Sequence, residues 1–195
     1  LGMLGLRYDP AYGGAGLDWS FTAVLFEELA RADNAGVTLG ISVHTDMATP
    51  SLAEFGSEEL KRRYLVPSIA GEMVSAIAVT EPDAGSDVAA VKTRAVRDGD
   101  DWVINGSKIY ITNAATADWL CLLAVTDPAA GYGGFSQIVV PTDARGFRYA
   151  LLDPELALTQ PARILAMTGY DAISHAVETC VTTKHNEVSA MLSKE

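Results

Sequence analysis

Residues 74–87 read VSAIAVTEPDAGSD, and the character of the chain changes here from helix-forming to strand-forming. Five of the first six residues are apolar and the run is β-prone, which predicts a strand over Val74–Val79. Proline and glycine then force an irregular path over 80–87, where threonine, serine and acidic residues supply hydrogen-bonding groups. On composition alone this is a surface turn, and it lacks the pattern and the lysine of a phosphate-binding loop.

The residues before this stretch are expected to be helical from 17 to 70. In the first part, apolar residues recur at the three- and four-residue spacing of an amphipathic helix. A second helix is predicted over Ala35–Ala48, followed by a break at Pro50. Ser57 can cap a third, short helix, which should end before Pro67.

The residues after this stretch predict further short strands, at 92–97, 102–105, 108–112, 119–125 and 135–140. Short strands separated by turns are typical of a compact antiparallel barrel or sandwich. The predicted fold class is therefore α+β: an N-terminal helical segment, then a small antiparallel β-barrel or sandwich domain, then a short helical tail. We place the domains at residues 1–72, 73–147 and 148–195.

Composition excludes several classes of function. The formal net charge of −11 argues against a nucleic-acid partner, because phosphate binding needs a basic face. Apolar runs stay well short of the ~20 residues that a membrane span requires, and Leu1 is not followed by a secretory signal pattern. Cys121 and Cys180 fit no metal or redox spacing and are expected to be buried thiols in a reducing compartment. The predicted location is cytoplasmic.

Four motifs in order then point to a known family. They are YGGAGL at 12–17, FGSEELK at 55–61, AVTEPDAGSD at 78–87 and INGSKIYITN at 104–113. Together they resemble the acyl-CoA dehydrogenases over about residues 1–147. The resemblance implies an FAD-dependent α,β-dehydrogenation of an acyl-CoA thioester, electron-transfer flavoprotein as partner, and a homotetramer.

The resemblance also implies where a flavin sits. The backbone of Ile77 to Val79 faces the pyrimidine side of the isoalloxazine ring, and the Thr80 hydroxyl is added there. Ser86 lies near the flavin and the CoA end of the substrate channel. Asp83 stands where the family commonly has glycine, but aspartate tolerates turn conformations.

The second flavin-contacting segment of the family maps to Tyr110, Ile111 and Thr112. Tyr110 supplies an aromatic ring against the flavin, and the Thr112 hydroxyl approaches the reactive nitrogen. Donors aimed at the ring stabilise the negative charge that builds up on reduction. Both residues also suit an ordinary strand that binds nothing.

No catalytic residue is predicted. The family's base is a carboxylate on a C-terminal helical bundle, and the resemblance ends near Phe147. Glu27, Glu28 and Glu58 lie in predicted helices and are most simply solvated charges. The chain is therefore expected to be truncated before the base and inactive on its own.

The tail resembles a different family, the iron-dependent alcohol dehydrogenases, at LDPELALTQP (152–161) and AMTGYDAISHAVE (166–178). This resemblance maps two ligands for a divalent metal, iron or zinc, to Asp171 and His175. An i,i+4 pair shares one helix face, although two ligands make an incomplete site. Alternatively, Thr168 caps a helix and His175 is a surface residue. The alternative functions are a remnant of a metal-dependent alcohol dehydrogenase or a non-enzymatic fusion chain.

Overall fold

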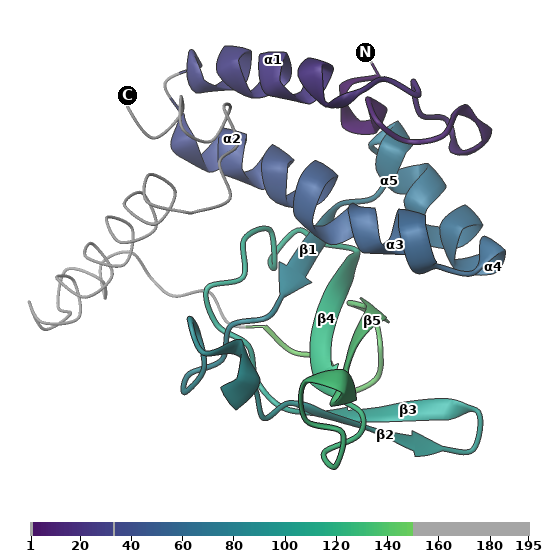
Figure 1. The fold of residues 1–195 in the computed structure, drawn as a ribbon, viewed down its shortest axis with the longest axis vertical. Coiled ribbons are helices and arrows are strands. Elements are labelled where there is room, and N and C mark those ends of the chain that lie inside the picture. Colours follow the sequence, from purple (N-terminus) through teal and green to yellow (C-terminus); the bar gives the residue numbers. More distant parts are fainter. Residues whose placement is uncertain (1, 33, 150–195) are drawn as a thin grey trace, which may run out of the picture. The chain divides into compact units, whose positions relative to one another are not determined.

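The computed structural model describes residues 2–32 and 34–149. Two compact units divide the chain, Leu1–Tyr149 and Ala150–Glu195, and the description that follows concerns the first of them. Within this unit, helices come first and strands second, as the α+β prediction requires (Figure 1). No helix among the described residues is long and apolar enough to cross a membrane. The predicted helical tail, with Asp171 and His175, lies outside the described residues.

The helical part extends from residue 3 to residue 70. Its segments in chain order are η1 (Met3–Gly5), η2 (Pro10–Tyr12), α1 (Trp19–Ala30), α2 (Ala35–Ser42), η3 (Val43–Ala48), α3 (Thr49–Phe55), α4 (Glu58–Leu60), η4 (Lys61–Leu65) and α5 (Val66–Ala70). Side chains of Asp18, Asn34 and Ser57 cap α1, α2 and α4 by accepting backbone N–H bonds, which confirms the predicted cap at Ser57.

Two predicted helix ends are wrong. Pro50 and Pro67 do not interrupt the chain; each lies at the start of the next helix, α3 or α5. Proline is tolerated in a first helical turn because its missing N–H has no partner there in any case. The π-helical turns η3 and η4 precede the two prolines and carry the chain into α3 and α5 without a break.

The strand part forms one five-stranded sheet. Its strands are β1 (Ser75–Ala78), β2 (Arg94–Asp98), β3 (Asp101–Asn105), β4 (Trp119–Val125) and β5 (Phe135–Pro141). The order is β1-β4-β2-β3, and β5 pairs with β4. The short 3₁₀ turns η5 (Val88–Ala90) and η6 (Gly131–Gly134) lie in the connections. In Figure 1 the β2–β3 hairpin projects from the end of the sheet.

The prediction of an antiparallel barrel or sandwich is wrong in two respects. The sheet is mixed, because β1 and β4 run parallel from Ser75↔Trp119 to Ala78↔Leu122, and β2 pairs with β4 in parallel. It is also not closed into a barrel. The long connection between β1 and β4 returns the chain to the start of the sheet, which sets β4 parallel to β1. The predicted strand at 108–112 belongs to this connection and is irregular.

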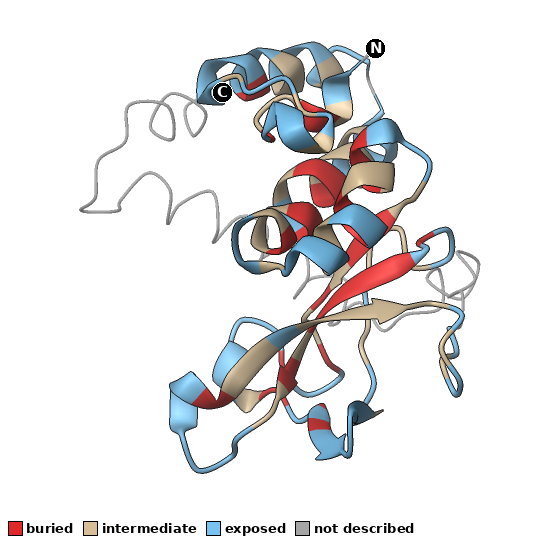
Figure 2. Ribbon diagram, turned by 90° about the vertical axis from the view of Figure 1, so that its right-hand side faces the viewer, coloured by how far each residue is buried: buried red, intermediate tan, exposed pale blue. Residues whose placement is uncertain are grey.

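Two hydrophobic clusters hold the unit together. The first joins helices to the sheet, with Leu52, Leu65 and Ile69 packed near Trp119 and Cys121. The second lies within the sheet and includes Ala76, Ala95, Leu120 and Leu122. Figure 2 shows the buried residues concentrated in the strands and in the helices nearest them. The buried Cys121 agrees with the prediction for that thiol.

Candidate functional site

Two segments far apart in the sequence meet beyond the end of β1. The Lys108 ammonium donates a 2.8 Å hydrogen bond from Nζ to the carbonyl oxygen of Val79. The backbone N–H of Ile109 donates a 2.9 Å bond to the carbonyl oxygen of Thr80. Residues 77–80 and 108–112, which the sequence predicted as the two parts of one site, are therefore held together by main-chain and side-chain bonds.

A buried carboxylate organises this junction. Glu81 accepts from the backbone N–H groups of Lys92 (2.7 Å) and Thr93 (2.9 Å) and from Lys108 Nζ (2.9 Å). Burial raises its pKa, but Thr93, Lys108 and the two N–H groups outweigh burial and lower the pKa to about 2. Glu81 is therefore ionised and joins three parts of the chain.

Lys108 is the buried partner of Glu81. The side chains of Lys108 and Glu81 are only 8% and 6% exposed. Burial lowers the pKa of Lys108 from its ordinary value, whereas the hydrogen bond and the charge of Glu81 favour the protonated form. Lysine is rarely buried unless it is paired, and here it is paired with both a carboxylate and a carbonyl group.

The 110–113 segment adopts an unusual backbone conformation. Tyr110 has φ +57° and Asn113 has φ +69°, whereas the other described residues with positive φ are glycines. Left-handed backbone is rare for a bulky residue such as tyrosine and cannot continue a strand, which explains why the strand predicted at 108–112 does not form. Such conformations cluster at functional sites, where surrounding contacts hold them.

Asn113 links this segment to two other elements. Its side-chain Nδ2 donates to the carbonyl oxygens of Gly40 in α2 (2.9 Å) and Ser75 in β1 (3.3 Å). The approach to α2 is close, because a Cβ at Gly40 would lie 3.0 Å from Asn113 Oδ1. Asn113 therefore fixes the end of the 110–113 segment against both α2 and β1.

His44 makes a second connection between the helices and β1. Its Nδ1 accepts from Ser75 N (3.0 Å) and lies 2.9 Å from Ser75 Oγ, while Nε2 lies 3.0 Å from the carbonyl oxygen of Ser68. These partners require the neutral ring with its proton on Nε2. Burial lowers the pKa of His44, although the bond to Ser68 opposes this. Ser75 is fully buried, so this pair is structural rather than nucleophilic.

Five of the seven predicted flavin contacts are half-buried: Ile77, Val79, Thr80, Ile111 and Thr112. Tyr110 is 62% exposed, and Ser86 lies exposed in the turn that follows the Glu81–Ala84 bridge. The chain thus offers two threonine hydroxyls and one aromatic ring on surfaces that the protein itself leaves partly open. This donor set fits a planar heterocycle with polar edges.

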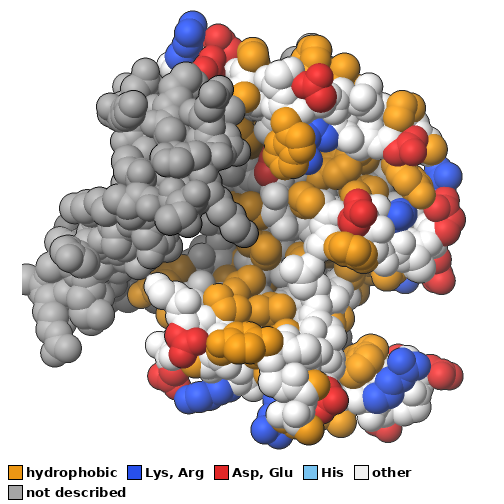
Figure 3. Space-filling view, viewed as in Figure 1, with side chains coloured by type: hydrophobic (Ala, Val, Ile, Leu, Met, Phe, Trp, Pro, Cys, Tyr) orange, Lys and Arg blue, Asp and Glu red, His pale blue; other side chains and the backbone are white. Residues whose placement is uncertain are grey.

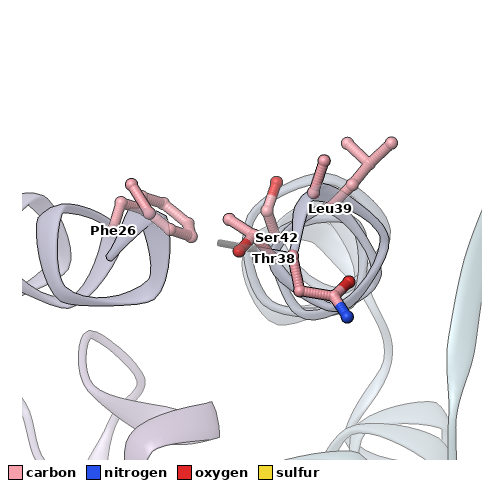
Figure 4. A pocket seen from close by; sticks show the side chains of 7 residues that line it. Phe26, Thr38, Leu39 and Ser42 are labelled. Atoms are coloured by element: carbon pink, nitrogen blue, oxygen red, sulfur yellow. The ribbon is translucent and has the colours of Figure 1, made fainter. Parts of the chain in front are cut away.

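An open pocket of about 610 Å³ lies between α1 and α2. Its lining residues are Phe26, Ala30, Asn34, Ala35, Thr38, Leu39 and Ser42. Figure 4 shows Phe26 pointing from α1 toward α2, with Thr38 and Ser42 on the facing helix. The wall is mainly apolar with hydroxyl groups, which suits an aliphatic ligand with some polarity.

Exposed apolar side chains add to this surface. On α1 the residues Phe21 and Val24 are exposed in the described unit, as are Val37 and Leu39 on α2. Figure 3 shows hydrophobic side chains on one face over both the helical and the strand parts. Packing within this unit therefore leaves part of the apolar surface of α1 uncovered.

Sequence reasoning missed the residues whose hydrogen bonds hold the segments of the site together. Glu81 and Lys108 were both inside quoted motifs, but a glutamate in a turn and a lysine before a predicted strand carry no signal of burial. His44 was placed only as a residue of a helix. Asn113 gave one usable signal, since asparagine is the non-glycine residue that most readily adopts left-handed backbone.

The metal prediction finds no support. Among the described residues, no group of three or more histidine, cysteine, aspartate or glutamate side chains could hold a metal ion. Asp171 and His175 lie outside the described residues.

Comparison with known proteins gives a consistent result. Residues 1–72 match the family "Acyl-CoA dehydrogenase, N-terminal domain", and residues 76–169 match "Acyl-CoA dehydrogenase, middle domain". The short-chain specific acyl-CoA dehydrogenase of Clostridium acetobutylicum is 40% identical over 158 residues, which cover 80% of this chain and 41% of that protein.

Solved structures agree. Butyryl-CoA dehydrogenase from Megasphaera elsdenii matches with a TM-score of 0.74 and 33% identity, covering 78% of this chain and 40% of that chain. The FAD complex of PigA matches with a TM-score of 0.71 and 33% identity, covering 74% and 38%. The chain therefore spans about two-fifths of the length of these relatives.

The comparisons also bear on the tail. The middle-domain match continues to residue 169 and so includes the first segment that resembled iron-dependent alcohol dehydrogenases, 152–161, and the first four residues of the second. That second resemblance finds no support, and neither does the alternative function built on it. The match to the middle domain extends about 20 residues beyond Phe147, where the sequence motifs had ended.

Proposed function

Because the chain belongs to the acyl-CoA dehydrogenase family through its N-terminal and middle domains, we propose that residues 77–80 and 109–112 form a binding face for the isoalloxazine ring of FAD. The observation that carries the proposal is the junction of these two segments through the Lys108–Val79 and Ile109–Thr80 hydrogen bonds. Bound FAD supplies the hydride-accepting chemistry, and the protein supplies position and electrostatics.

Each segment has its own part in this proposal. The backbone of Ile77 and Val79, with the Thr80 hydroxyl, contacts the pyrimidine side of the ring. From the other segment, Tyr110 packs its ring against the flavin. The backbone of Ile111 and the Thr112 hydroxyl lie at the reactive edge, where a donor stabilises developing negative charge.

The substrate proposed is an acyl-CoA thioester. Ser86, exposed after the Glu81–Ala84 bridge, lies at the CoA end of the channel. The pocket between α1 and α2 takes the acyl chain, since its wall is mainly apolar and Asn113 joins α2 to the flavin face. No described carboxylate is assigned to removal of the substrate's α-proton.

The remaining family properties are also proposals for this chain. They are α,β-dehydrogenation as the reaction, electron-transfer flavoprotein as the electron acceptor and a homotetramer as the assembly. The division into a helical domain over 1–72 and a flavin-binding domain over 73–147 is a further proposal. The two family matches support the boundary between these domains, because they meet between residues 72 and 76, whereas the middle-domain match continues to residue 169.

FAD titration tests the cofactor proposal directly. The purified chain is added to FAD, and quenching of the flavin fluorescence is followed to saturation. We expect Thr112→Ala to weaken affinity about two- to tenfold, the value of one neutral hydrogen bond. Thr126→Ala is the matched control, because the Thr126 hydroxyl bonds within the β4–β5 hairpin and should not affect affinity. Absence of quenching by a folded chain would refute the proposed site.

A further inference from the structure

Pairing with Glu81 does not by itself explain where the Lys108 ammonium lies. Among the described residues Lys92 is an exposed lysine, with a side chain that is 71% exposed in its pair with Asp83. The Lys108 ammonium is instead buried, and one of its bonds goes to the carbonyl oxygen of Val79 rather than to a carboxylate. The Glu81 carboxylate, with Oε1 2.9 Å from Lys108 Nζ, would be enough to neutralise the ammonium charge.

The bond to Val79 acts on a peptide group that belongs to the proposed flavin face. The Val79 carbonyl and the Thr80 N–H are the two ends of one conjugated, planar amide. An ammonium bonded to the oxygen withdraws electron density and makes the N–H of the same amide a stronger donor, as in chains of hydrogen bonds that polarise one another. The Thr80 carbonyl accepts from Ile109, so the next amide is fixed as well.

We propose that Lys108 is a positioning residue that polarises the Val79–Thr80 peptide group and thereby strengthens its interaction with the pyrimidine edge of reduced FAD. This inference rests on the proposed flavin site. Because reduction adds negative charge to the ring, a stronger donor at this edge favours the reduced form over the oxidised form. Lys108 therefore raises the midpoint potential of the bound cofactor.

The neighbouring charges make the sign of the effect testable. Glu81 is the anion closest to Lys108, and it has two backbone donors of its own from Lys92 and Thr93. Removing the positive charge should disfavour reduced FAD. Removing the negative charge of Glu81 should favour it when the potential is measured at mildly acidic pH, which keeps the Lys108 amine protonated without its carboxylate partner. A purely structural role predicts the same direction for both, because either change loosens the same junction.

The experiment uses the full chain loaded with FAD. Affinity for oxidised FAD is measured by fluorescence quenching, and the midpoint potential by anaerobic two-electron reduction with dithionite beside a reference dye. For Lys108→Met we expect affinity for reduced FAD to fall about tenfold more than that for oxidised FAD. This lowers the potential by about 30 mV for a two-electron couple.

Control variants separate charge from structure. Arg97→Met removes one positive charge from an exposed side chain of the β2–β3 hairpin and should leave the potential unchanged. Lys108→Arg keeps the charge and should restore most of the lost potential. Glu81→Gln should shift the potential upward, and it carries the test if circular dichroism shows that Lys108→Met is unfolded.

The outcomes are distinct. A wild-type chain that binds no FAD refutes the proposed site, and the role of Lys108 with it. A wild-type chain that binds FAD, together with a Lys108→Met variant of unchanged potential, overturns only the role of Lys108. A downward shift in both Lys108→Met and Glu81→Gln also overturns it, in favour of a structural role.

Discussion

The segment 108–113 and strand β4 have a similar propensity for strand and very different structures. Both are rich in β-formers, and both were predicted as strands. β4 forms as predicted, is paired on both edges and is largely buried. The 108–113 segment is irregular, partly exposed and held by side-chain hydrogen bonds from Lys108 and Asn113. Tertiary context therefore decides between two segments that local propensity treats alike.

The comparison predicts that stability depends on β4. Trp119 is fully buried at the start of β4, packs against Tyr64 and donates from Nε1 to Ser68 Oγ. Trp119→Ala should lower the free energy of unfolding by about 3–5 kcal/mol, because it leaves a large cavity and an unpaired hydroxyl. Chemical denaturation measures the effect. A loss below about 1 kcal/mol would show that β4 is not the main support of the unit.

Acid should weaken the junction beneath the 108–113 segment. The pKa of Glu81 is about 2 in the folded protein and near 4.5 when the chain is unfolded. The contribution of Glu81 is therefore complete above pH 4.5 and is lost as the pH falls toward 2. The difference corresponds to about 3 kcal/mol.

Denaturation at several pH values checks this, with Glu81→Gln as the comparison. The variant should lose less stability than the wild type between pH 4.5 and 2, since its side chain does not titrate. Equal losses over this range would assign the acid sensitivity to other carboxylates.

A smaller effect is expected at Asn113. Asn113→Ala removes the donor to the Gly40 and Ser75 carbonyl groups and places alanine in left-handed backbone, which together should cost about 2 kcal/mol. Asn113→Gly keeps the backbone conformation accessible and should cost about 1 kcal/mol. Thermal unfolding of the two variants separates the side-chain bonds from the backbone. Equal losses would show that the left-handed conformation stores no strain.

The sequence predicted the regular parts of the fold better than the site. The strands at 119–125 and 135–140, the cap at Ser57 and the order of helices before strands follow from local pattern. The parallel pairing of β1 with β4 does not, because it depends on how a 40-residue connection returns. Motif resemblance predicted that Thr80 and Thr112 belong to one site, which stays a prediction. The burial of Glu81 and Lys108 is a tertiary property that one sequence does not encode locally.

The smallest predicted effect on stability is also the most informative. Tyr110 is 62% exposed and left-handed, so Tyr110→Gly loses little packing and relieves a conformation that costs a side-chain residue roughly 1–2 kcal/mol. The greater entropy of glycine in the unfolded chain offsets part of this gain, and we expect stabilisation of up to about 1 kcal/mol.

Tyr132 provides the control, since it is exposed without a positive φ, and Tyr132→Gly should lower stability by about 0.5–1 kcal/mol. If Tyr110→Gly is stabilised while its affinity for FAD falls, tyrosine is kept at this strained position for the ligand and not for the fold. If both tyrosine variants lose the same stability, the left-handed conformation at Tyr110 carries no strain, and the contrast between the 108–113 segment and β4 is one of exposure alone.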